Sequence, residues 1–286
     1  MHLLIPIPKT TVDKSNGIKT VCRRWTSSPY RQYAFVVRLD IHHFCSSSLS
    51  ANILGIGIKR TEGEKMIYVT GDTHGDFSRF KDPQFKKLGA GDTLIICGDF
   101  GFIWDGSKRE NAILKKLMSL EYTICFIDGC HENFDLLEKY PESIWNGGMA
   151  RVIAPNLIHL MRGQVFTIEG KKIFTFGGGH SQDIEFRFDG DWWEREQPTH
   201  EEIMEAVRNL ELNNHAVDFV ITHEPPASVK DCLGVDVFQR IEVHALFEEI
   251  TKACDYEKWF FGKCHIDKHI PVKFYAVFNN VTPLIK

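Results

Sequence analysis

The chain has 286 residues, of which 43% are hydrophobic and 25% charged; this composition is typical of a globular protein and excludes a disordered or collagen-like chain. No uncharged apolar stretch approaches the roughly 18 residues that a membrane-spanning helix needs. Eight cysteines are too sparse for a disulfide scaffold and the sequence shows no secretory leader, so we expect a cytoplasmic protein with no membrane partner.

The net charge of −4 is divided unevenly at Met66. Residues 1–65 contain ten Lys/Arg and four Asp/Glu, a net charge of +6, whereas residues 66–286 contain 24 and 34, a net charge of −10. The first part also shows little helical or alternating periodicity. We therefore expect residues 1–65 to be a poorly structured N-terminal extension and residues 66–286 to form a single domain.

Three interpretations of the extension stay open: a start codon assigned too far upstream, an organelle-targeting leader, or a genuine accessory segment. The codons for residues 62–65, Glu-Gly-Glu-Lys, are purine-rich and can spell a bacterial ribosome-binding site just before Met66. This favours the first interpretation and a bacterial source. The segment is not clearly amphipathic, which argues against a targeting leader.

Strand-like and helical segments alternate from Met66 onward. We expect strands at 66–70, 93–97 and 123–127, with helical segments at 77–88 and 108–120 between them. This alternation predicts an α/β fold.

The middle of the chain changes to short strand-like runs, at 152–160, 164–168 and 172–176. Glu169-Gly170 predicts a hairpin turn between the last two. Thr199 and Glu202 have the spacing of a capping box and predict a helix that continues to Leu210. A strand at 217–222, a helix at 243–253 and strands at 259–261 and 274–278 complete the chain.

Asp and His residues follow five of the predicted strands, at the point where each strand ends. They are Asp72 and His74, Asp99, His131, His223, and His265. In an open α/β sheet, ligands bind at the carboxyl ends of the strands, so these side chains should converge. A lone His or a Gly-Asp pair is ordinary loop chemistry. Together, however, Asp and His suit borderline divalent metals, and the set predicts a metal site.

The same segments form five ordered blocks: Asp72-Thr73-His74, Gly98-Asp99, Gly129-Cys130-His131-Glu132, His223 alone, and Gly262-Lys263-Cys264-His265. They resemble the blocks DxH, GD, GNH[DE], a lone His and GHxH of the calcineurin-like metallophosphoesterase superfamily, over about residues 66–265. The resemblance implies a four-layer α/β/β/α sandwich. It also implies that a metal-activated water hydrolyses a phosphomonoester or a phosphodiester.

The resemblance further implies a role for each residue. Asp72, His74, Asp99 and His265 would hold a first metal ion. Asp99 would bridge to a second ion, which His223 would also bind. His131 would contact the phosphate and assist the leaving group as a general acid. One or two divalent ions are implied, as manganese, zinc, iron or nickel.

Two departures from the family pattern fall on the second ion. Cys130 stands where the family has Asn, and Lys263 replaces the first His of GHxH. Cys130 either binds metal as a thiolate or packs as a small apolar residue. Lys263 either neutralises phosphate charge in place of the missing ion or turns out to solvent.

Two further segments have weaker claims on the site. His180 follows Gly177-Gly178-Gly179, whose backbone could approach a bound phosphate. Arg187, Trp192, Trp193 and Arg195 lie in a loop that could cap the site and stack on a ring, although the two tryptophans are more simply interpreted as core.

The acidic domain favours a small phosphorylated substrate over nucleic acid, because nucleic-acid binding normally requires a basic face. A nuclease is the enzymatic alternative. The alternative from another class is a catalytically weak or inactive phosphate- or nucleotide-binding protein that keeps the fold and one metal.

Overall fold

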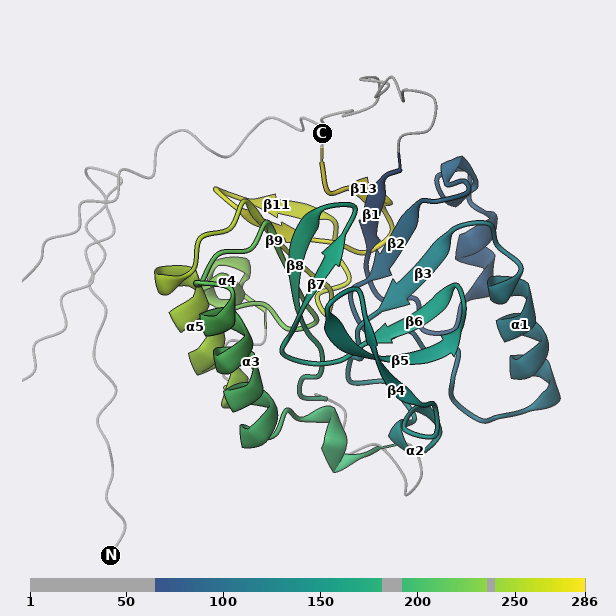
Figure 1. Ribbon diagram of the computed structural model, residues 1–286, viewed down its shortest axis with the longest axis horizontal. Helices are drawn as coiled ribbons and strands as arrows, with labels where there is room; N and C mark the ends of the chain where they lie inside the picture. The colour runs from purple at the N-terminus through teal and green to yellow at the C-terminus, as the bar shows by residue number, and fades with distance from the viewer. Residues whose placement is uncertain (1–64, 182–191, 236–239, 286) are drawn as a thin grey trace, which may run out of the picture. The chain divides into compact units, whose positions relative to one another are not determined.

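The strands of the protein form two sheets with helices packed against them, as its computed structural model shows (Figure 1). The structure describes residues 65–181, 192–235 and 240–285. Residues 1–64 of the predicted extension, and Arg187, therefore lie outside the described residues. No helix in the described ranges is long and apolar enough to cross a membrane.

The first sheet has the strand order β13-β1-β2-β3-β6-β5-β4. Its central strands β1, β2, β3 and β6 are parallel, and the pairs at both edges are antiparallel. The strands are β1 (Ile67–Thr70), β2 (Thr93–Ile96), β3 (Thr123–Phe126), β4 (Glu142–Trp145), β5 (Gly148–Ala154), β6 (Leu157–Leu160) and β13 (Thr282–Pro283).

The second sheet has the order β11-β12-β10-β9-β8-β7, in which β12, β10, β9 and β8 are parallel. Its strands are β7 (Gln164–Ile168), β8 (Lys171–Phe176), β9 (Phe219–Thr222), β10 (Lys258–Phe261), β11 (Lys268–Ile270) and β12 (Phe274–Ala276). The buried strands of both sheets are rich in Ile, Val and Phe, as strands covered on both faces are.

The helices are α1 (Lys108–Met118), α2 (Phe134–Leu137), α3 (His200–Leu212), α4 (Ala227–Leu233) and α5 (Val243–Ala253), with short 3₁₀ helices η1 (Phe77–Lys81), η2 (Phe85–Lys87) and η4 (Glu194–Glu196). Three hydrophobic clusters show how these elements pack. One contains Ile95 and Phe260 and lies between the two sheets. Leu114 of α1 packs in a cluster on the first sheet, and Phe247 of α5 packs with α3 in a cluster on the second. Helices thus cover the face of each sheet that the other sheet leaves open.

The α/β class and most of the expected elements are confirmed. Thr199 caps α3, with both hydrogen bonds of the capping box present. Glu169 and Gly170 form the turn between β7 and β8, both with positive φ, as the favoured two-residue hairpin turn requires.

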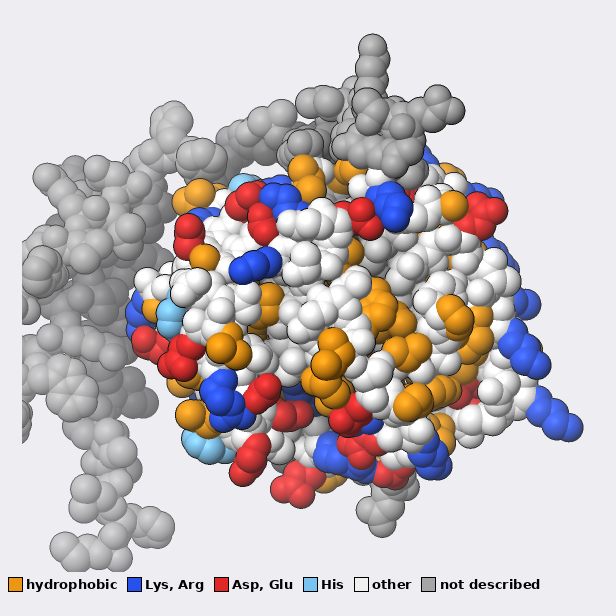
Figure 2. Space-filling view, in the orientation of Figure 1, with side chains coloured by type: hydrophobic (Ala, Val, Ile, Leu, Met, Phe, Trp, Pro, Cys, Tyr) orange, Lys and Arg blue, Asp and Glu red, His pale blue; other side chains and the backbone are white. Residues whose placement is uncertain are grey.

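Two expectations about the elements are wrong. The helix at 77–88 is instead the pair η1 and η2, since Pro83 cannot donate the hydrogen bond that would continue a helix. The run at 152–160 is two strands, β5 and β6, separated by a turn at Pro155 and Asn156. The sequence pattern also missed β4, whose Ile144 is 78% exposed. Figure 2 shows that hydrophobic side chains gather on the surface over β4, β5 and β6.

Candidate metal centre

The strand-end segments converge at the boundary between the two sheets. Asp72 and His74 follow β1, Asp99 follows β2, and His265 follows β10 of the other sheet. One donor atom from each of these four side chains lies within 4.8 Å of those of the other three. Both carboxylates are buried and both imidazoles are exposed to solvent.

Glycines allow this close approach. An added Cβ at Gly98 would lie 2.1 Å from Nδ1 of His223, and one at Gly262 would lie 2.3 Å from Oδ1 of Asp72. Gly98 has a φ of +102° in addition, a conformation that side chains rarely adopt. At both positions the missing side chain therefore makes room for a candidate metal-binding residue that follows a strand of the other sheet.

Four residues of the site have left-handed backbone conformations. They are His74, Asp99, Lys263 and His265, with φ of 45°, 46°, 62° and 50°. Positive φ is uncommon outside glycine, and such residues cluster at functional sites, where surrounding contacts hold them. Here they turn the backbone directly after a strand so that the side chains face one another.

The donor set fits a divalent ion of the borderline class. His265 Nε2 lies 2.9 Å from Asp72 Oδ2 and 3.0 Å from His74 Nε2. His74 Nε2 is 3.8 Å from Asp99 Oδ2. The hydrogen bond with Asp72 raises the pKa of His265, whereas burial lowers the pKa of His74.

His223 is also oriented as a ligand. Its buried Nδ1 lies 3.0 Å from the carbonyl oxygen of Cys97, which can only accept, so Nδ1 carries the proton. In the neutral imidazole Nε2 then presents a lone pair; it has no hydrogen-bond partner among the residues that the structure describes, and it lies 3.6 Å from Oδ1 of Asp99. A cation between these two acceptors would satisfy both.

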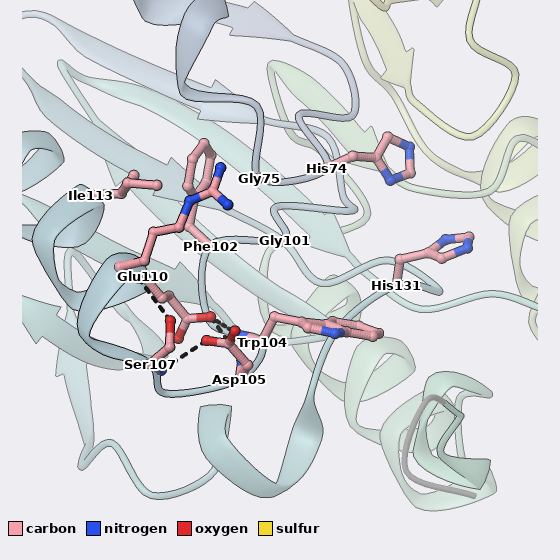
Figure 3. A pocket seen from close by; sticks show the side chains of 11 residues that line it. His74, Gly75, Gly101, Phe102, Trp104, Asp105, Ser107, Glu110, Ile113 and His131 are labelled. Atoms are coloured by element: carbon pink, nitrogen blue, oxygen red, sulfur yellow. Dashed lines mark hydrogen bonds between the residues drawn. The ribbon is translucent and has the colours of Figure 1, made fainter. Parts of the chain in front are cut away.

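His131 lies beside this cluster and is anchored to Asp99. Its backbone N–H donates to Asp99 Oδ1 at 2.8 Å, and its Nδ1 is 3.0 Å from Asp99 Oδ2. The side chain is 36% exposed and lines a cavity of about 390 Å³ together with His74 (Figure 3).

Cys130 and Lys263 contact each other. Lys263 Nζ donates to Cys130 Sγ at 2.9 Å and to the carbonyl oxygen of His180 at 2.8 Å. The Lys263 side chain is only 13% exposed. Of the two alternatives for this residue, the one in which it turns out to solvent is therefore wrong. Burial raises the pKa of the Cys130 thiol and keeps it protonated.

A buried charged group behind Lys263 was missed by the sequence analysis. Glu224 directly follows His223, and its carboxylate lies 3.1 Å from Lys230 Nζ, 3.5 Å from His244 Nε2 and 3.8 Å from Lys263 Nζ. Burial alone would raise the pKa of Glu224, but these neighbours hold it well below its usual range. Burial likewise opposes the charge on Lys263, yet the Glu224 carboxylate raises its pKa, so it remains an ammonium.

The segment around His180 contributes through its backbone. The sequence suggested that this backbone could approach a bound phosphate. The N–H groups of Gly178 and Gly179 instead donate to the carbonyl oxygens of Asp128 and Glu196, so they are not directed at an anion site. The His180 side chain pairs with Gln197, 3.3 Å away.

The two tryptophans of the predicted capping loop are half-buried instead of belonging to the core. Trp193 packs edge-on against Trp104, with ring centroids 5.6 Å apart. Trp104 lines the same cavity as His131.

Comparison with known proteins agrees with this geometry. No curated protein matches the chain. Residues 65–262 match the family of calcineurin-like phosphoesterases, a range that contains every strand-end block except the last three residues of the final one. A match over more than half of the chain, with the strand-end residues gathered in one cluster, shows that this chain belongs to the calcineurin-like phosphoesterase family.

Proposed function

We propose that the protein hydrolyses a small phosphomonoester or phosphodiester with the aid of a divalent ion held by Asp72, His74, Asp99 and His265. The observation that carries this proposal is the convergence of two buried carboxylates and two imidazoles within 4.8 Å, next to an open cavity. When bound, such an ion would polarise the attacking water and the phosphoryl group.

His131 is proposed as the general acid. Asp99 accepts from its backbone N–H and contacts its Nδ1, and these two contacts orient the ring. A proton held at Nε2 would then be delivered to the leaving oxygen on the cavity side. This assignment needs no movement of the chain.

The second ion position of the family fits this chain less well. His223 Nε2 and Asp99 are present, but the Lys263 ammonium has no lone pair to offer and its donors are directed at Cys130 and His180. We therefore propose one tight metal ion and a fixed positive charge at Lys263, which would neutralise phosphate charge through space.

The same pair of departures favours a second candidate function. A protein that kept one metal and the positive charge of Lys263 could bind a phosphate or nucleotide with little or no turnover. Metal content and turnover, measured on the same sample, separate the two functions.

The experiment is elemental analysis of the purified protein combined with hydrolysis of p-nitrophenyl phosphate and bis(p-nitrophenyl) phosphate. Manganese, zinc, iron and nickel are each added back after chelation. We expect close to one tightly held ion per chain, and turnover that is lost on chelation and restored by metal. Asp99→Asn should lose both, whereas His200→Ala, which removes a surface imidazole paired with Glu242, should lose neither.

Three results would contradict parts of the proposal. A protein that binds no divalent ion is not a metal-dependent hydrolase. One ion without turnover of either ester assigns the binding function. Two equally tight ions would show that Lys263 does not replace the second.

A further inference from the structure

The cavity beside the metal centre reaches well beyond the space that a phosphoryl group needs. Its volume of about 390 Å³ is within the range of small-molecule sites, roughly 300–1000 Å³. His74 and His131 stand at one end of it, and Ile113 stands at the opposite end (Figure 3). If the proposed hydrolysis takes place at the histidines, the rest of the cavity holds the remainder of the substrate.

The indole of Trp104 lines the cavity, and both the backbone and the ring of this residue have contacts within the protein. Its backbone N–H donates to Glu110 at 2.7 Å, and its carbonyl oxygen accepts from Asn133 at 2.6 Å. Trp193 packs against the ring at an interplanar angle of 84°. A ring fixed in this way loses little conformational entropy when a planar group stacks on it.

The charges that line the cavity are not equivalent. The carboxylate of Glu110 accepts from the backbone N–H groups of Trp104, Asp105 and Gly106, so its role is to hold the loop. Asp105 accepts from the backbone of Ser107. The side chain of Arg109 has no hydrogen-bond or ion-pair partner within the described ranges of the chain, and its guanidinium is the cation that the cavity offers to a ligand.

From this combination we infer that the substrate is a nucleoside phosphate. Its phosphoester lies at His74 and His131, its base stacks on Trp104, and Arg109 donates to an acceptor oxygen or nitrogen of the ligand. Aromatic side chains stack on any base, and the planar donors of a guanidinium suit phosphate oxygens and base edges alike. The inference rests on the proposed function for the placement of the phosphoester.

The test compares adenosine 5′-monophosphate with ribose 5-phosphate, which has the same sugar and phosphate but no base. Binding to the manganese-loaded full chain is measured by calorimetry. We expect the nucleotide to bind about tenfold more tightly or better, because one base–aromatic stack contributes on that order. Trp104→Leu should bring the two dissociation constants close together, and Trp104→Phe should retain most of the preference.

Arg109 is tested against a matched control on the same helix. Arg109→Ala should weaken nucleotide binding several-fold. Lys108→Ala removes the same charge one residue away, outside the cavity lining, and should leave binding unchanged. If the two variants weaken nucleotide binding equally, Arg109 contributes only through the net charge of the protein and does not contact the ligand.

The inference is overturned if the wild-type protein does not prefer the nucleotide, or if Trp104→Leu leaves the preference intact. A phosphoserine peptide that binds more tightly than the nucleotide would assign the cavity to peptides. Hydrolysis of the aryl esters without any base preference overturns this inference alone. Base-dependent binding without turnover of any ester overturns the proposed hydrolysis alone.

Discussion

His131 depends on Asp99 for its position, and Asp99 in turn faces both His223 and His74. One carboxylate thus orients the proposed acid and belongs to the metal cluster. Burial would raise the pKa of Asp99, but His223 and His131 lower it well below its usual range, so it stays ionised. His131 contacts both oxygens of Asp99, while His223 lies near Oδ1 and His74 near Oδ2, so the carboxylate faces the proposed acid and the metal cluster at once.

Replacement of His131 separates proton transfer from metal binding. We expect His131→Ala to lower kcat by about 10²–10⁴-fold, the usual contribution of a general acid, while metal content stays the same. Turnover and elemental analysis on one preparation check both parts. Loss of the metal in this variant would instead make His131 a ligand.

Cys130 and Lys263 can be returned to the family pattern. We expect Cys130→Asn with Lys263→His to raise the metal content toward two ions, because an amide oxygen and an imidazole join Asp99 and His223 to give four protein ligands. Either single change should leave the metal content near one ion per chain. Cys130→Ser, which keeps an acceptor for Lys263, is the control. If all four variants bind the same amount of metal, neither residue faces the second position.

Among the elements, a buried ion pair joins the end of β3 to the segment after β6 and to α3. Arg162 donates two hydrogen bonds to Asp128, at 2.8 and 2.7 Å, and a third to Glu202 of α3. His159 Nε2 lies 3.1 Å from the other oxygen of Asp128. The strand-end loops of the first sheet are therefore fixed by charge as well as by packing.

Breaking this pair should be costly. We expect Asp128→Asn to lower the free energy of unfolding at pH 7 by about 3–5 kcal/mol, because Arg162 would lose its buried counter-charge and keep only the partly exposed carboxylate of Glu202. Asp218→Asn, which removes the partly exposed partner of Lys171, should cost less than about 1 kcal/mol. Urea unfolding of the three proteins measures both. If both variants lose a similar amount of unfolding free energy, the Asp128–Arg162 pair does not have the stabilising role that we assign to it.

The effect of Asp128→Asn should also depend on pH. Burial alone would raise the pKa of Asp128, but Arg162 and His159 lower it below the unfolded value of about 3.9. A lowered folded pKa contributes stability that is complete above the unfolded value and is lost as the pH falls below it. The difference in the free energy of unfolding between the wild type and Asp128→Asn should therefore become smaller below about pH 4. A constant difference from pH 7 to pH 3 would show that Asp128 is not ionised.

For the whole molecule, the candidate metal-binding residues matter because they follow strands of both sheets. Asp72 and Asp99 follow strands of the first sheet, and His265 follows a strand of the second. An ion bound by all of them would link the sheets at one end. It would also relieve the repulsion between two buried carboxylates, so metal binding should stabilise the fold as a whole.

We propose that residues 66–286 fold without residues 1–65. The start of this part is held by its own contacts, since the backbone N–H of Met66 donates to Asp92 at 3.0 Å and its carbonyl oxygen accepts from Thr93 at 2.9 Å. Met66–Lys286 should melt within about 4 °C of the full chain, a shift equivalent to about 1 kcal/mol or less. A version that begins at Gly71, and so lacks β1, should not fold. An insoluble Met66–Lys286 would show that the extension belongs to the domain.

The local elements were predictable where short-range chemistry decides them. The capping box at Thr199 and the hairpin turn at Glu169 need only neighbouring residues, and both are present. The break at Pro83 is equally local, because a proline lacks the N–H that would continue the expected helix. β4 could not be predicted: its exposed Ile144 breaks the alternation of a half-buried strand.

By itself, the sequence determined which residues could bind a metal, because Asp and His at the ends of parallel strands of one sheet share an edge. Only the tertiary structure decided that the edges of two sheets meet, so that His265 of the second sheet lies beside Asp72 and Asp99 of the first. The tertiary structure alone also decided what Lys263 does. Its partner Cys130 is 133 positions away in the sequence, and its partner Glu224 follows a different strand. Hydrophobic periodicity relates only neighbouring residues, so it cannot predict contacts over such separations. The cavity has the same origin: Trp104 and His131 lie on different loops, and only packing brings both to its walls.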